Sequence, residues 1–65
     1  MRDYFEIKKH ILGWMCGKIS FTAIELRDMI DRDFNEEEQA PAYRAVYNME
    51  EHRLLTRQKD GTWVI

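Results

Sequence analysis

The chain has few of the residues on which covalent, catalytic or phosphate-binding chemistry usually depends. Its 65 residues include one cysteine, one proline, three glycines and a single serine. A lone cysteine, Cys16, cannot form an internal disulfide, so a reducing cytoplasm is the expected location. The glycines are too scattered for a phosphate-binding loop. No apolar run has the length of a membrane span or the pattern of a secretory signal.

Catalytic and metal-binding arrangements are equally scarce. Ser20 has no nearby histidine in the sequence, and Cys16 falls on a half-apolar helical arc, where a free thiol is usually a packing residue. His10 and Cys16 lie about 120° apart around their predicted helix, and His52 stands alone, so no set of metal ligands converges. We therefore predict neither an enzyme nor a metal or cofactor site.

The composition that remains is that of one small globular domain, residues 1–65. Hydrophobic residues make up 45% of the chain, but a chain of this length hides only about 60% of its unfolded surface, so its core is marginal. The net charge of −2 is unevenly distributed, because residues 31–40 hold five of the twelve acidic residues and one basic residue. The remainder is faintly basic, which gives weak support for a polyanionic partner.

The first helix is predicted over residues 2–16, where apolar residues recur at helical spacing and Gly17 follows as a terminator. Its apolar surface is wider than a small core requires. Scattered surface apolar side chains are common and are one explanation. The other is contact with a second copy of the chain, since a marginal core gains from oligomerisation. The predicted dimer residues are Phe5, Leu12 and Trp14.

A second helix is predicted over residues 23–31. Thr22 and Glu25 have the spacing of a capping box, in which each side chain satisfies a backbone N–H at the start of the helix. Phe21 and Leu26 have the spacing of a hydrophobic staple around that cap. Residues 18–21 before it are expected to be a short extended link or a single strand.

A third helix is predicted over residues 40–52. Pro41 suits the first turn of a helix, where no N–H donor is needed. We expect residues 31–40 to form an acidic connector, within which Asn35 and Glu38 have the spacing to cap a short turn of their own. The apolar stripe of the third helix consists of Ala42, Ala45, Val46 and Met49.

The end of the chain is predicted to be a β-hairpin. Asp60-Gly61 is a strong turn signal, and residues 54–58 and 62–65 flank it with β-forming side chains. The predicted fold class is therefore α+β, mostly α: a winged helix, in which three helices are closed by a two-stranded wing.

Residues 42–57, AYRAVYNMEEHRLLTR, followed by the Asp60-Gly61 turn, resemble the recognition helix and wing of winged helix-turn-helix regulators of the PadR-like and MarR-like kind. A looser likeness extends over residues 18–65. The resemblance implies a bacterial or phage transcriptional regulator that binds double-stranded DNA. Two features depart from it: Arg53 stands where the family usually has glycine, and the predicted connector is longer and more acidic than a tight turn.

In winged helices the start and outer face of the third helix enter the major groove. Arginine can bind guanine, asparagine or glutamine can bind adenine, and tyrosine can contact phosphate or sugar. The wing and the start of the second helix are expected to contact neighbouring backbone. The predicted DNA-binding residues are Gln39, Tyr43, Arg44, Tyr47 and Asn48 on the third helix, Arg57, Gln58 and Lys59 on the wing, and Lys18 and Thr22 before the second helix.

The alternative is a winged helix that binds another protein and no DNA. Three consecutive glutamates, residues 36–38, would repel phosphate if they lay beside a duplex. Tyr43 and Tyr47, one turn apart, suit a contact surface of either kind, because aromatic residues are enriched at interfaces. Arg44 also has a plain role as a solubilising residue, and Arg57 and Lys59 as protection for a hairpin edge.

Overall fold

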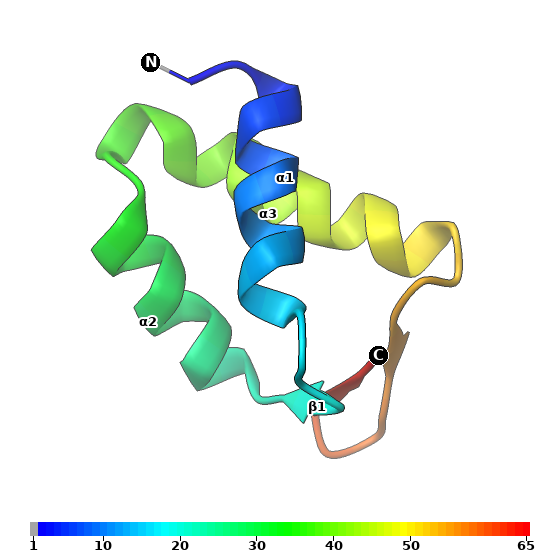
Figure 1. Ribbon diagram of the computed structural model, residues 1–65. Coiled ribbons are helices and arrows are strands. Elements are labelled where there is room, and N and C mark those ends of the chain that lie inside the picture. Colours follow the sequence, from blue (N-terminus) through cyan, green and yellow to red (C-terminus); the bar gives the residue numbers. More distant parts are fainter. Residues whose placement is uncertain (1) are drawn as a thin grey trace.

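The computed structural model describes residues 2–65, so residue 1 of the predicted domain lies outside the described part. Its elements are α1 (Tyr4–Met15), β1 (Ser20–Phe21), α2 (Ala23–Asp33), α3 (Glu36–Glu51), β2 (Thr56–Arg57) and β3 (Trp63–Val64) (Figure 1). The mostly helical α+β class and the winged-helix layout are confirmed. Within residues 2–65, none of the helices combines the length and apolar character needed to cross a membrane.

The ends of α1 follow the local signals. Asp3 caps its start, where the carboxylate accepts a 2.8 Å hydrogen bond from the backbone N–H of Glu6. Gly17 ends the helical segment with φ of +86°, a conformation that costs glycine little. The helix is slightly shorter than predicted because Asp3 serves as the cap and Cys16 is already extended.

The capping box of α2 is confirmed. Thr22 Oγ1 accepts from Glu25 N–H, and Glu25 Oε1 accepts from Thr22 N–H, both at 3.1 Å. The helix continues to Asp33, two residues beyond its predicted end, and Asp33 Oδ2 lies 2.8 Å from Nε2 of His10 on α1. Contact with α1 therefore supports the last turn of α2.

The predicted start of the third helix is wrong. Asn35 and Glu38 form a complete capping box, with bonds of 3.0 and 3.1 Å, and α3 begins at Glu36 instead of near residue 40. The acidic run is therefore the first turn of α3, where the positive end of the helix dipole stabilises negatively charged side chains. The connector is reduced to Phe34 and Asn35, and Pro41 lies inside the helix. The expectation that this connector is longer and more acidic than a tight helix-turn-helix turn is therefore wrong.

The sheet has the strand order β1-β3-β2 and is antiparallel throughout. β3 pairs Trp63 with both Phe21 and Arg57, so the link before α2 is a real strand. The wing strands are shorter than predicted, because Leu55 is buried in the core and precedes β2. The wing turn depends on Gly61, whose φ is +87°.

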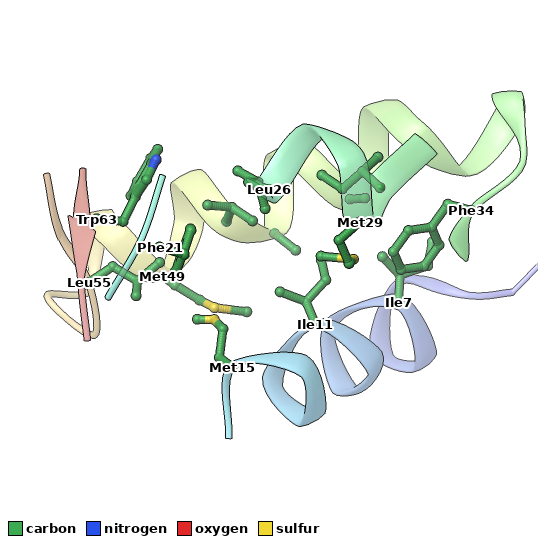
Figure 2. Close-up of a cluster of buried hydrophobic side chains, with 14 residues drawn as sticks. Ile7, Ile11, Met15, Phe21, Leu26, Met29, Phe34, Met49, Leu55 and Trp63 are labelled. Atoms are coloured by element: carbon green, nitrogen blue, oxygen red, sulfur yellow. The ribbon is translucent and has the colours of Figure 1, made fainter. Parts of the chain in front are cut away.

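Within residues 2–65, fourteen buried apolar side chains form the core, and α3 contacts both α1 and α2 (Figure 2). The predicted stripe of α3 is fully buried, and Phe21, Leu55 and Trp63 extend the core beneath the sheet. This packing fixes α3 against the bundle by one side and leaves its other side exposed beside the wing. The core residues are Ile7, Ile11, Met15, Phe21, Leu26, Met29, Ile30, Phe34, Ala42, Ala45, Val46, Met49, Leu55 and Trp63.

Candidate nucleic-acid interface

The exposed side of α3, here called the α3 outer face, is defined by Ala40, Tyr43, Arg44 and Tyr47. These residues recur at helical spacing opposite the buried stripe. Arg44 is exposed and takes part in none of the ion pairs within residues 2–65, so its guanidinium is available for a ligand. Tyr47 is half exposed, and Tyr43 is partly buried against the core.

A hollow of about 190 Å³ lies between the α3 outer face, the start of α2 and the wing. Three aromatic side chains line it, and the rings of Tyr47 and Trp63 are 6.1 Å apart. Burial raises the pKa of Tyr43, with the charge of Asp31 as a further cause, so its phenol remains a hydrogen-bond donor at neutral pH. The complete lining is Ala23, Leu26, Tyr43, Tyr47, Arg57, Gly61 and Trp63.

Arg57 is positioned by two kinds of contact at this hollow. Its guanidinium lies over the Trp63 ring, 4.4 Å from the centroid, and over Tyr47 at 5.6 Å. Its Nε also lies 3.1 Å from Oε2 of Glu50, so its charge is paired within the domain. Gln58 and Lys59, the other predicted wing residues, are exposed near the tip.

One predicted residue of the third helix turns away from the α3 outer face. Asn48 is half buried, and its Nδ2 donates a 2.9 Å hydrogen bond to the Tyr4 hydroxyl on α1. Asn48 was predicted as a base-reading residue, but α1 occupies the flank on which it lies. Gln39 is half buried like Tyr43 and lies one helical turn before it, on the same side of α3.

The residues before α2 are likewise engaged elsewhere. The Thr22 hydroxyl and N–H are both used in the capping box, so a carboxylate already occupies that helix start. The Lys18 ammonium lies 4.9 Å from the centroid of the Trp14 ring. Both residues line a hollow that is separate from the one lined by Tyr43. Thr22, in contrast, directly precedes Ala23, which lines the hollow beside Tyr43.

Acidic side chains lie near the same face. Glu36 and Glu37 are exposed in the first turn of α3, and Glu51 is exposed in its last turn. Glu38 differs from them, because it is buried and bound by Arg2. The local charge of the exposed side of α3 is consequently negative, with Arg44 as its cation.

Sequence reasoning missed Trp63 and Glu50 as parts of this region. Trp63 is only 4% exposed, but it forms the base on which Arg57 rests. Its position was available from the hairpin, because the Asp60-Gly61 turn sets Arg57 opposite Trp63. Glu50 carried no comparable local signal, since it meets Arg57 only when the wing packs on α3.

The residues predicted to form a dimer interface do not all lie on one surface. Phe5 and Leu12 line one hollow on α1, whereas Trp14 packs edge-on against Phe21, with ring centroids 5.1 Å apart. Within residues 2–65 no three His, Cys, Asp or Glu side chains are grouped to hold a metal ion. Comparison with known proteins found no matching family model, curated protein or solved structure.

Proposed function

We propose that this chain is a non-enzymatic, cytoplasmic winged-helix protein that binds double-stranded DNA and regulates transcription. The observation that carries the proposal is the two-residue connection between α2 and α3. It leaves the α3 outer face exposed beside the wing, with the unpaired Arg44 between Tyr43 and Tyr47. In helix-turn-helix proteins the second helix of such a pair enters the major groove.

Arg44 is the base-reading or phosphate-binding cation in this proposal, and Lys59 at the wing tip contacts the neighbouring backbone. Tyr43 and Tyr47 donate hydrogen bonds to phosphate or pack on sugars. A single copy has few free cations on this side, so its affinity is modest and it releases few counterions on binding.

Fluorescence anisotropy with a pool of random-sequence duplexes tests this function. Affinity should fall between low and physiological salt, with a slope of log affinity against log salt that corresponds to a few phosphate contacts. Arg44→Ala should weaken binding about tenfold and reduce the slope of log affinity against log salt by about one. The matched control is Arg32→Ala, which removes the same charge from the side of α2 that carries the hollow beside Trp14. An equal loss in both variants, or no binding at low salt, contradicts the proposal.

A second function is favoured by one specific observation, the excess of exposed carboxylates over Arg44 on α3. Such a face suits a basic protein segment that packs apolar stems on Tyr43 and Tyr47. In that case duplex DNA leaves the anisotropy unchanged at low salt. Chemical shifts of Tyr43 and Tyr47 should instead move on addition of lysine- and arginine-rich peptides.

A further inference from the structure

Arg2 lies at the turn where α2 meets α3 (Figure 1). It precedes α1 in the chain, and its side chain reaches the end of one of these helices and the start of the other. Nη2 of Arg2 donates a 2.6 Å hydrogen bond to the carbonyl oxygen of Asp33, the last residue of α2. The backbone N–H and Nε of Arg2 donate hydrogen bonds of 2.9 and 3.1 Å to Oε2 of Glu38 in the first turn of α3, and Nη2 donates to Oε1 at 3.3 Å.

The connector between the two helices is held by the same side chain. The guanidinium of Arg2 lies over the Phe34 ring, 4.5 Å from its centroid, which is the geometry of a cation–π contact. Phe34 is buried, and together with Asn35 it makes up the whole connection between α2 and α3. Arg2 therefore contacts the end of α2, the connector and the start of α3 at once.

The charges at this turn favour such a link. The last carbonyl groups of a helix have no partner within the helix and carry the negative end of its dipole, and the first turn carries the positive end. The cation of Arg2 is placed at the negative end of α2, and the carboxylate of Glu38 is placed at the positive end of α3. The Glu38 side chain is only 5% exposed, so water competes little with these bonds.

Packing alone constrains the angle between these helices less than the position of α3 on α1. α3 packs more extensively on α1 than on α2. The backbone dihedrals of Phe34 and Asn35 set the direction in which α3 leaves α2, so small changes there rotate the whole of α3. A side chain that binds both helices opposes that rotation.

We infer that Arg2 is a positioning residue, which fixes the orientation of α3 relative to α2 without contacting a ligand itself. This orientation is a property of the free domain. Its consequence for binding rests on the proposed function: a duplex must receive α3 in its major groove while other parts of the domain contact the backbone. A fixed orientation lowers the cost of ordering these parts when DNA binds.

Residual dipolar couplings of the backbone N–H groups, measured without DNA, test the orientation directly. In the unaltered chain the couplings of α2 and α3 should fit one common alignment. Arg2→Lys keeps a cation opposite Glu38, but an ammonium lacks the planar fork that binds the carboxylate and the Asp33 carbonyl together. The couplings of α3 should then shrink and deviate from the alignment fitted to α2. Arg2→Ala should give a larger deviation, and circular dichroism verifies that both variants retain their helices.

The matched control is Arg32→Ala, which removes an arginine from the same end of α2. Arg32 Nε lies 2.8 Å from Oδ1 of Asp33, the next residue of its own helix, so this pair does not link α2 to α3. Its couplings should fit one alignment, as in the unaltered chain. Couplings that still fit one alignment in both Arg2 variants overturn the inference, as does an equal deviation in Arg32→Ala.

Duplex affinity separates positioning from direct contact. Arg2→Lys and Arg2→Ala should each weaken binding about three- to tenfold, the range expected of residues that act without touching the ligand. The slope of log affinity against log salt should stay the same in Arg2→Ala, because no phosphate contact is lost. A slope lower by about one would make Arg2 a phosphate ligand and overturn the inference. If the unaltered chain binds no duplex, the proposed function fails, and the couplings still decide the role of Arg2.

Discussion

The two ends of α3 are held by similar contacts in very different surroundings. Near its start, Arg2 Nε lies 3.1 Å from Glu38 Oε2, and near its end Arg57 Nε lies 3.1 Å from Glu50 Oε2. Each guanidinium also covers an aromatic ring, at 4.5 Å for the first and 4.4 Å for the second. The carboxylates differ in access: the Glu38 side chain is 5% exposed and that of Glu50 is 31% exposed.

That difference separates a contact that maintains the fold from one that a ligand can replace. Glu38 accepts four hydrogen bonds, from the backbone and side chain of Arg2 and from the backbone of Asn35. The Arg57–Glu50 pair is accessible to solvent, and exposed pairs contribute little to stability. It also borders the α3 outer face, where under the proposed function a DNA phosphate would take the place of the Glu50 carboxylate.

The largest effect expected from this comparison is on stability. Arg2→Ala leaves the buried Glu38 carboxylate without its main partner and should lower the melting temperature by several degrees. Arg57→Ala, which also deletes one arginine, should change it by an amount close to experimental error. Thermal melting followed by circular dichroism measures both. Equal shifts would show that the two ends are not distinct.

Acid should reveal the same asymmetry. Hydrogen bonds from Arg2 lower the pKa of Glu38 from 4.5 to about 2, and bonds from Arg32 and then His10 lower the pKa of Asp33 from 3.8 to about 2. A carboxyl group whose pKa is lower in the folded state than in the unfolded state stabilises the fold. This stabilisation is complete at pH values above the unfolded-state pKa and is lost as the pH falls toward the folded-state pKa. The melting temperature should therefore fall between about pH 5 and pH 2.

Glu38→Gln should flatten this fall, since the glutamine cannot be protonated in that range. Glu50→Gln removes the corresponding charge at the other end of α3, where the side chain is 31% exposed, and serves as the matched variant. Melting temperatures at a series of pH values decide between them. Parallel profiles for Glu38→Gln and the unaltered chain would contradict the role given to Glu38.

A smaller effect is expected on DNA affinity. Glu50→Gln releases Arg57 from its partner and should strengthen duplex binding a few-fold, with a slope of log affinity against log salt steeper by about one. Asp28→Asn makes the same charge change beside Trp14, away from the α3 outer face. Anisotropy titration should show a gain for Glu50→Gln alone. The same gain in both would mean that only net charge matters.

The smallest effect concerns the residue after α3. Arg53 has φ of +63° and forms a helix-ending motif, in which the N–H of Leu54 donates a hydrogen bond of 2.8 Å to the carbonyl oxygen of Met49. The resemblance of residues 42–57 to winged-helix regulators implies glycine at this position. Arg53→Gly should stabilise the domain by about 0.5 kcal/mol, as relief of left-handed strain outweighs the added freedom of the unfolded chain.

Arg53→Ala is the control for that substitution, because it removes the same charge and side chain but keeps the strained backbone. Urea unfolding of the two variants and the unaltered chain gives the free energies. A gain for alanine equal to that for glycine would place the cause in the side chain.

Elements that depend on neighbouring residues were predicted well. The capping box of α2, the end of α1 at Gly17 and the turn at Asp60-Gly61 each involve side chains and backbone within a few positions. The start of α3 was misjudged because Pro41 competed with Asn35 as a start signal. A complete capping box is the stronger of the two, and a helix already begun tolerates the proline.

The candidate site was predicted less completely, and Asn48 shows why. Helical spacing placed it opposite the apolar stripe, but a helix has two flanks, and its own periodicity does not say which flank a neighbour will cover. Packing of α1 against α3 brings the Tyr4 hydroxyl to Asn48.

The amino-acid order alone is enough to set where most turns and helix ends fall and which stripes are apolar, because these follow from short-range hydrogen bonding and periodicity. Assembly of the domain decides the partners of its charges. Arg2 and Glu38 are 36 positions apart, whereas Arg57 and Glu50 are seven apart and meet because the chain turns back after α3. Packing of these segments removes water from the Glu38 carboxylate and leaves the Glu50 carboxylate exposed.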